Sequence, residues 1–257
     1  RSSNEITVVK DMARPQLISL PSPADGILNA GDEIALTFNE DIRSGAIIKN
    51  YLSVKGKLNN AQVSHDGVFQ SAGGAGARTS AAVSLDGKPF SVGAWINWTE
   101  AGSVFRHGTA QNNFDVSITS DGKLKATIAG SEYVSNNAVP QGKWCYLNVS
   151  YDPNDSKPHL TANVASDAEE TELLSLDNVK NYSGNGAVTI GDQISAAIHE
   201  VTLWNESRSW TEAKMGMYQT HAASTDGLIG YWHLDEGHGA VGEDKARSRH
   251  LALPDGN

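Results

Sequence analysis

The stretch 196-AAIHEVTLWN-205 says more about the fold than any other part of the sequence. It is rich in aliphatic, β-branched and aromatic residues, which favours a β-strand. It ends in Trp204 and Asn205, so a large aromatic side chain can fill a core while the asparagine turns the chain. His199 and Glu200 stand side by side within it, and neighbouring residues of a strand face opposite sides of the sheet. We therefore expect this pair to form part of the wall of a sheet and not a catalytic dyad.

Seven further stretches have the same strand-like character, and turn-forming residues separate them. They are 34–38, 90–98, 114–120, 123–129, 144–151, 159–165 and 187–192. Between two of them, Asp121 and Gly122 can supply the positive φ that a tight hairpin turn needs. Residues 210–221 favour a short helix, with Thr211 as its N-cap and Tyr218 facing inward. Short strands at this spacing, with hardly any helical periodicity, predict an all-β sandwich of two antiparallel sheets.

Alternation along two of these strands separates core residues from outward aromatic residues. The expected core set is Phe90, Val92, Ala94, Ile96, Leu147, Val149 and Tyr151. Four aromatic side chains are assigned to the outer faces, where they can form a platform for a sugar ligand: Trp95, Trp98, Trp144 and Tyr146. The alternative is that these aromatic side chains pack beneath loops.

Composition narrows the classes of partner. The 257 residues are 39% hydrophobic and 19% charged, which is typical of a soluble globular protein. The formal net charge is −10 and the sequence contains no basic patch, so we expect neither a nucleic acid nor an anionic membrane as partner. Cys145 is the single cysteine, so an intrachain disulfide is impossible. The sequence contains no run of about 18 apolar residues, so we expect no transmembrane helix. No signal peptide is recognisable. We expect the chain to be a piece of a larger protein.

Four motifs that follow one another in order resemble the concanavalin A-like, laminin-G-type jelly-roll module of secreted bacterial proteins. They are FSVGAWINW (90–98), DGKL (121–124), GKWCYLNVSYD (142–152) and AIHEVTLWNESRSWTEAKM (197–215), and the closing stretch 227–253 matches as well. The resemblance implies a two-sheet antiparallel jelly-roll β-sandwich over residues 53–257. In the last motif His199 replaces one acidic residue of the family's pattern, whereas Glu200 keeps the next one. Such a resemblance indicates the fold more firmly than the function.

The N-terminal part carries a second, shorter resemblance. The segment 21-PSPADGILNAGDEIALTFNEDI-42 is similar to the start of a bacterial Ig-like domain. Most of the strands that such a domain needs are missing from the sequence. We therefore expect residues 1–52 to form a partial Ig-like β segment in front of the jelly roll.

The jelly-roll resemblance also implies a structural calcium ion at the rim of a sheet. Glu200 is the position that the resemblance supports best, and Asp66 in 65-HDG-67 is the second candidate ligand. Calcium takes about six to eight oxygen ligands, many of them backbone carbonyls, so few acidic side chains need be visible in the sequence. The alternative is that Glu200 is a solvent-facing strand residue and that Asp66 and Gly67 form a turn.

Catalysis is not expected. Glycoside hydrolases with this jelly roll use two carboxylates on one strand face, about 5 Å apart in retaining enzymes, and no strand-like run here carries such a pair. We predict a non-catalytic recognition or adhesion module of a larger secreted or cell-surface bacterial protein. Its ligand is expected to be a glycan or an extracellular protein, with support from calcium. The alternatives are a spacer domain without a ligand and, less favoured, an accessory domain of a glycoside hydrolase; the sequence does not predict an oligomeric state.

Overall fold

A computed structural model of the protein describes residues 68–110, 112–153, 157–166, 169–235 and 241–254. The chain divides into two units, Arg1–Gly56 and Lys57–Asn257, and all described residues belong to the second. The expected Ig-like segment, the strand at 34–38 and Asp66 lie outside the described residues. These three expectations, and the boundary between residues 52 and 53, stay predictions.

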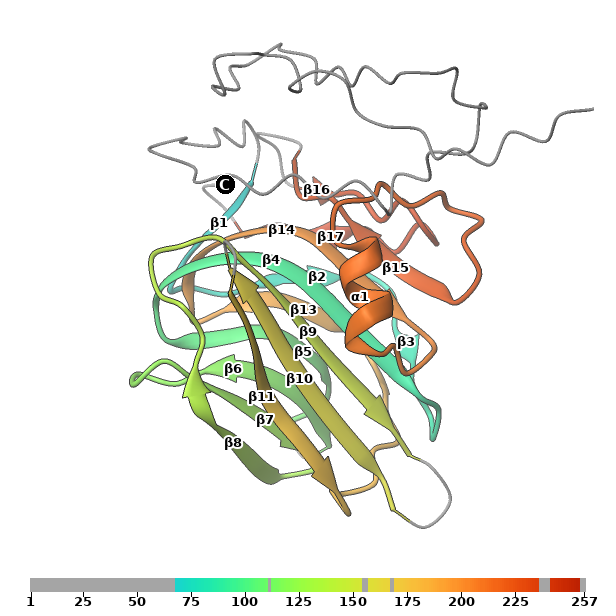
Figure 1. The fold of residues 1–257 in the computed structure, drawn as a ribbon. Helices are drawn as coiled ribbons and strands as arrows, with labels where there is room; N and C mark the ends of the chain where they lie inside the picture. The colour runs from blue at the N-terminus through green and yellow to red at the C-terminus, as the bar shows by residue number, and fades with distance from the viewer. Residues whose placement is uncertain (1–67, 111, 154–156, 167–168, 236–240, 255–257) are drawn as a thin grey trace, which may run out of the picture. The chain divides into compact units, whose positions relative to one another are not determined.

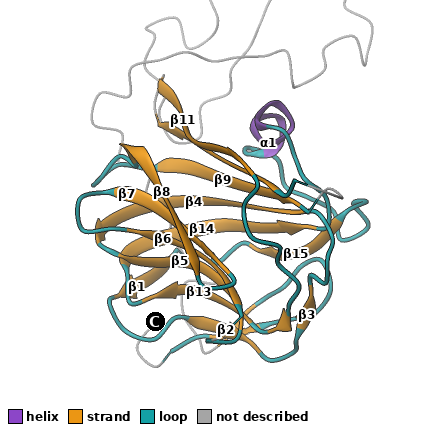
Figure 2. Ribbon diagram, turned by 90° about the horizontal axis from the view of Figure 1, so that it is seen from below, coloured by secondary structure: helices purple, strands orange, loops and turns teal. Residues whose placement is uncertain are grey.

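The described unit is mostly β and consists of two large antiparallel sheets that pack face to face (Figures 1 and 2). The seven-stranded sheet has the order β1-β14-β4-β9-β10-β11, with β15 paired to β14. Its strands are β1 (Phe69–Ala72), β4 (Phe90–Glu100), β9 (Cys145–Asp152), β10 (His159–Ser166), β11 (Glu169–Asp177), β14 (Ser195–Trp204) and β15 (Leu228–Trp232). The predicted β-sandwich is therefore confirmed.

The eight-stranded sheet has the order β16-β17-β2-β13-β5-β6-β7-β8. Its strands are β2 (Ala77–Thr79), β5 (Gly102–Gly108), β6 (Asn113–Ile118), β7 (Lys123–Ile128), β8 (Ser131–Ala138), β13 (Val188–Asp192), β16 (Val241–Gly242) and β17 (Leu251–Ala252). A further pair is formed by β3 (Val83–Ser84) and β12 (Asn185–Gly186). The turn between β6 and β7 contains Gly122 at φ +80°, as the predicted hairpin requires.

Aromatic rings join the two sheets in the core. Phe90 of β4 lies 4.7 Å from Phe114 of β6 and 5.2 Å from Tyr151 of β9, measured between ring centroids. The expected core set of β4 and β9 is buried throughout, which confirms its assignment. Burying a side chain such as Phe90 contributes about 1.5–3 kcal/mol to the free energy of unfolding.

One short helix, α1 (Trp210–Gly216), lies between β14 and β15 in the sequence and covers the outer side of the seven-stranded sheet (Figure 1). Its N-cap is Ser209 and not Thr211 as expected, because Ser209 and Glu212 hydrogen-bond each other's backbone N–H groups in a capping box. The expectation that Tyr218 faces inward is also wrong, because the helix ends before it and its side chain is 76% exposed. No helix among the described residues is long and apolar enough to cross a membrane.

Candidate functional site

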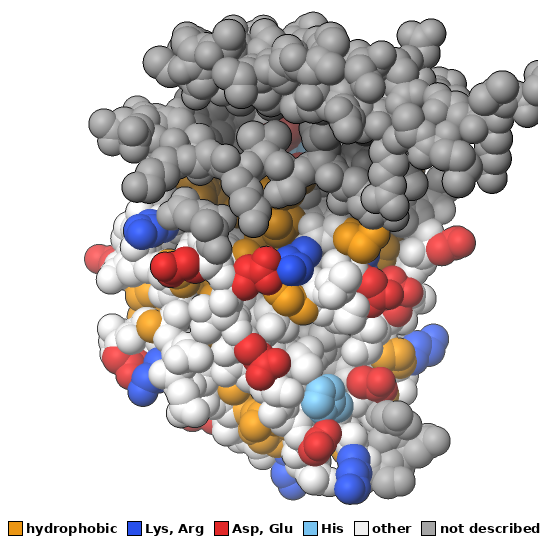
Figure 3. All heavy atoms as spheres, viewed as in Figure 1, with side chains coloured by type: hydrophobic (Ala, Val, Ile, Leu, Met, Phe, Trp, Pro, Cys, Tyr) orange, Lys and Arg blue, Asp and Glu red, His pale blue; other side chains and the backbone are white. Residues whose placement is uncertain are grey.

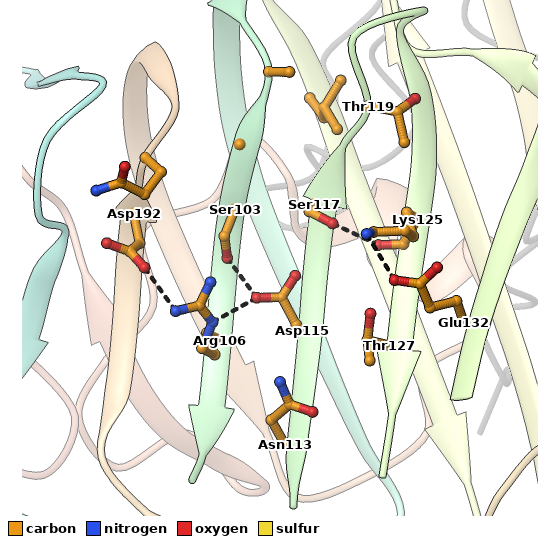
Figure 4. A pocket seen from close by; sticks show the side chains of 14 residues that line it. Ser103, Arg106, Asn113, Asp115, Ser117, Thr119, Lys125, Thr127, Glu132 and Asp192 are labelled. Atoms are coloured by element: carbon orange, nitrogen blue, oxygen red, sulfur yellow. Dashed lines mark hydrogen bonds and ion pairs between the residues drawn. The ribbon is translucent and has the colours of Figure 1, made fainter. Parts of the chain in front are cut away.

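A groove of about 530 Å³ crosses the outer face of the eight-stranded sheet. Strands β13, β5, β6, β7 and β8 each contribute side chains to it (Figure 4). Alternation along β6 explains its polar lining: Asn113, Asp115 and Ser117 face outward, while the residues between them enter the core. Most of the side chains that line the groove can donate or accept hydrogen bonds.

Arg106 lies at the centre of the groove and joins two carboxylates from neighbouring strands (Figure 4). Its Nε is 2.7 Å from Oδ2 of Asp115, and its Nη1 is 2.6 Å from Oδ2 of Asp192. Ser103 donates from Oγ to the same Oδ2 of Asp115 at 2.9 Å. The strand register places Arg106 opposite Asp115 and Asp192 opposite Ser103, so the cluster follows from the pairing of β13, β5 and β6.

The ion pairs fix the charge and the position of this guanidinium. Burial alone would lower the pKa of Arg106, but the hydrogen bonds and the attraction from Asp115 and Asp192 raise it. Asp192 is held in turn, because its Oδ1 accepts a hydrogen bond from the backbone N–H of Gly76 at 3.3 Å. The centre of the groove is therefore preorganised before any ligand arrives.

The end of the groove near β7 and β8 is looser. Lys125 donates from Nζ to Oε1 of Glu132 at 2.8 Å, and both side chains are substantially exposed. Such an exposed ion pair contributes little to stability, about 0–1 kcal/mol, and can open at small cost. Thr127 lies on the same outer face, between the fixed centre and this pair (Figure 4).

The predicted aromatic residues lie on the other sheet. Trp95 and Tyr146 are opposite each other in the register of β4 and β9, with ring centroids 5.5 Å apart, on the outer face as expected. Tyr146 is only 5% exposed, because Trp210 of α1 lies against it. Trp95 donates from Nε1 to the carbonyl of Met217 at 2.8 Å. This pair holds α1 and the residues after it against the sheet.

Of the two remaining predicted aromatic residues, one is buried in the core. Trp98 is 3% exposed and belongs to the core, so its assignment to the outer face is wrong. The reason is regular alternation along β4, which puts Trp98 on the same side as Phe90 and Ile96. Trp144 is half-buried and precedes β9.

The expected separation of His199 and Glu200 is wrong as well. Glu200 has a φ of +54° and lies in a β-bulge, where the register of β14 with β4 shifts between His199 and Thr202. The extra residue of the bulge turns the side chain of Glu200 toward that of His199. Nε2 of His199 therefore lies 3.9 Å from Oε1 of Glu200. Nδ1 of His233 lies 3.1 Å from the same oxygen, and Tyr231 donates its hydroxyl to Oε2 at 2.5 Å. Burial raises the pKa of Glu200.

These contacts bear on the predicted calcium ion. Calcium needs about six to eight oxygen ligands, whereas a phenol and an imidazole already engage both oxygens of Glu200. Within the ranges that the structure describes, no group of three or more His, Cys, Asp or Glu side chains is arranged to hold a metal ion. Glu200 is thus engaged by protein donors, and the second candidate ligand, Asp66, lies outside the described residues, so the calcium site stays a prediction.

Figure 3 shows the face that carries α1. Acidic and basic side chains are interspersed there and are not gathered by sign. The described Lys and Arg side chains visible on this face therefore do not gather into a large basic patch.

The chain is similar to solved structures of other proteins. A Bacteroides ovatus ATCC 8483 protein, described as a candidate carbohydrate-binding protein, is 15% identical with a TM-score of 0.52, over 74% of this chain and 59% of that one. A heptameric SAP-like pentraxin from Limulus polyphemus is 13% identical with a TM-score of 0.42, over 74% of this chain and 93% of that one. At 15% identity the likeness to the Bacteroides protein shows the fold alone, and the chain spans about three-fifths of that protein. A comparison with curated proteins found no match.

The sequence itself matches a family model. The model describes the concanavalin A-like lectin/glucanases superfamily in its laminin-G form, and it matches residues 71–214, more than half of the chain. The matched range begins in β1 and ends in α1, so it contains every strand that lines the groove. The chain therefore belongs to the concanavalin A-like lectin/glucanases superfamily.

Proposed function

We propose that the protein is a non-catalytic glycan-binding module and that the groove of the eight-stranded sheet is its binding site. One observation carries the proposal: the outward polar side chains of five neighbouring strands converge around Arg106 to form a hollow of about 530 Å³. A hollow of this size is in the range of small-molecule binding sites. Sugar hydroxyl groups both donate and accept hydrogen bonds, which suits a lining that mixes carboxylates, a guanidinium, hydroxyls and amides.

Preorganisation supports the same function. Arg106, Asp115 and Asp192 already hold one another in place, so a ligand need not order them. Hydrogen bonds from a sugar hydroxyl to an ionised carboxylate are short and about twice as strong as neutral ones. The groove can therefore bind a sugar without an aromatic platform.

The position of Arg106 argues against hydrolysis. In a glycoside hydrolase the scissile bond lies between the two carboxyl groups. Here the guanidinium of Arg106 lies between Asp115 and Asp192 and bonds to both. A glycosidic bond has no room to enter between them.

The setting of the module follows from the same proposal. A glycan-binding domain serves recognition or adhesion, so we propose that it belongs to a larger secreted or cell-surface protein. The groove lies on the opposite sheet from Glu200, so the proposed glycan contact does not depend on calcium.

A glycan array probed with the purified protein tests the proposal. We expect binding that Arg106→Met abolishes and that Asn113→Ala weakens, the latter without disturbing an ion pair. The matched control is Asp177→Asn in β11, an exposed residue of the other sheet, which should bind as the wild type does. A blank array with a folded protein would indicate a protein ligand or a spacer role, and binding that survives both groove variants would place the site elsewhere.

A further inference from the structure

The charges inside the groove are already paired with one another. The cationic side chains of the lining are Arg106 and Lys125, and the acidic ones are Asp115, Glu132 and Asp192. Three carboxylates against two cations give the lining a formal net charge of −1. Arg106 is bonded to Asp115 and Asp192, and Lys125 is bonded to Glu132.

We propose that the groove selects uncharged glycans and excludes acidic ones such as uronate, sialylated or sulfated chains. The inference rests on the proposed glycan-binding function of the same groove. It adds the class of ligand, which neither the fold nor the polar character of the lining decides.

An acidic group on the ligand finds no unpaired cation among the described residues of the lining. To pair with Nε or Nη1 of Arg106 it would have to displace Asp115 or Asp192, whose side chains are 9% and 18% exposed. At the remaining N–H donors of Arg106 it would lie close to these two carboxylates, which already balance the charge of the guanidinium. A displaced carboxylate at such a position loses its counter-ion while it remains largely out of water, which is strongly unfavourable. Displacing Glu132 from Lys125 is easier because that pair is exposed, but it leaves an extra negative charge beside the ligand.

The field of the whole chain acts in the same direction. The formal net charge is −10, so a polyanionic chain is repelled before it makes contact. Screening by salt weakens this long-range term but leaves the cost of breaking the central ion pairs. Exclusion of acidic glycans should therefore persist at physiological ionic strength.

Uncharged hydroxyl groups meet no such obstacle. The bonds that Asp115 makes to Ser103 and Arg106 both go to its Oδ2, which leaves Oδ1 as an acceptor for a sugar O–H. Arg106 uses its Nε and Nη1 in the ion pairs and keeps further N–H donors for a ring or hydroxyl oxygen. A neutral sugar can thus add hydrogen bonds without breaking any.

Matched pairs of glycans that differ in charge test the inference. The probes are polygalacturonate with its methyl ester, sialylated with desialylated oligosaccharides, and sulfated with desulfated chains, all titrated against the whole protein. For a pair that binds, we expect the uncharged member to bind at least about tenfold more tightly, which corresponds to about 1.4 kcal/mol. Asp115→Asn combined with Asp192→Asn frees Arg106 and should reduce or invert this preference; Asp192→Asn alone, at the more exposed position, should shift it in the same direction. Asp177→Asn, the matched control, should keep the preference.

The outcomes separate the two proposals. Equal or tighter binding of the acidic members by the wild type overturns the charge selection and leaves the glycan function standing. An unchanged preference in the folded double variant also overturns it, because the preference would then not arise at Arg106. Binding to neither member of any pair overturns the glycan function and this inference with it.

Discussion

Gly93→Ala tests whether the aromatic layer beneath α1 is packed as the structure shows. Gly93 lies on the outer face of β4, beside Tyr146 of β9. A Cβ at this position would be 2.2 Å from Oη and 3.0 Å from Cζ of Tyr146, and 2.9 Å from Oγ1 of Thr202. Non-bonded heavy atoms prefer about 3.5–4.0 Å, so Tyr146 must shift by about 1 Å or more. It cannot shift alone, because Trp95 and Trp210 lie against its ring.

Overpacking of this kind costs about 1–3 kcal/mol of unfolding free energy. In a domain of this size each kcal/mol lowers Tm by about 2–4 °C, so we expect Gly93→Ala to lower Tm by about 2–12 °C. Urea unfolding followed by tryptophan fluorescence measures the free energy directly. In the Gly93→Ala background, Tyr146→Phe should recover part of the loss, because it removes the hydroxyl that is closest to the new methyl group.

Gly74→Ala is the matched control. Its added Cβ would meet no atom within 4 Å, and its φ lies outside the left-handed region. Its stability should therefore stay within about 0.5 kcal/mol of the wild type or rise slightly. If Gly93→Ala is as stable as Gly74→Ala, the reasoning about the packing beneath α1 is refuted.

Three further predictions concern pH, helix capping and calcium. His107 is fully buried with both ring nitrogens hydrogen-bonded, and burial lowers its pKa below the ordinary value of 6.5. Below about pH 6.5 the unfolded chain therefore binds a proton at this residue that the folded chain does not, so the unfolding free energy should fall as the pH drops through about 6.5. Unfolding measured across this pH range should show a less steep fall in His107→Gln. Ser209→Ala should lower the unfolding free energy by about 1 kcal/mol, because it removes the N-cap of α1, whereas Thr211→Ala should lower it much less. Urea unfolding of both variants decides which residue caps the helix. Adding calcium or EDTA should leave Tm unchanged because donors already engage both oxygens of Glu200. A rise in Tm with calcium that Glu200→Gln abolishes would instead establish the predicted calcium site.

Alternation and turn chemistry made much of the fold predictable. The stretches 90–98, 123–129 and 144–151 show a clear apolar set or a hairpin turn, and each became a strand of the sandwich. Strands β5 and β8 were missed because charged and amide side chains interrupt their pattern. Pairing with neighbouring strands stabilises them, and a tertiary effect of this kind is not visible in local propensity. Small residues dominate 71–82 and give no strand pattern, yet this stretch contains the end of β1 and all of β2.

The groove had one visible signal in the sequence. Along 114–120, Asp115 and Ser117 alternate with apolar residues, which marks an outward polar row. The site could not be completed, because Arg106 lies in a strand that was not predicted and Asp192 is distant in sequence. Register across strands decides such a site, and one sequence does not contain it.

Two expected placements, the outward position of Trp98 and the separation of His199 from Glu200, were wrong for local reasons. Extending the alternation of β4 by one more step places Trp98 in the core, so that error was avoidable. The bulge at Glu200 was not predictable, because it requires a positive φ at a residue type that rarely adopts one.

The most direct test of the central claim is chemical-shift mapping of the labelled protein with the best neutral oligosaccharide from the array. The account predicts that amide signals of β5, β6, β7 and β13 shift on titration, while those of β9, β10 and α1 stay in place. Shifts confined to Trp95, Tyr146 and α1 would move the binding site to the seven-stranded sheet and contradict the assignment of the groove.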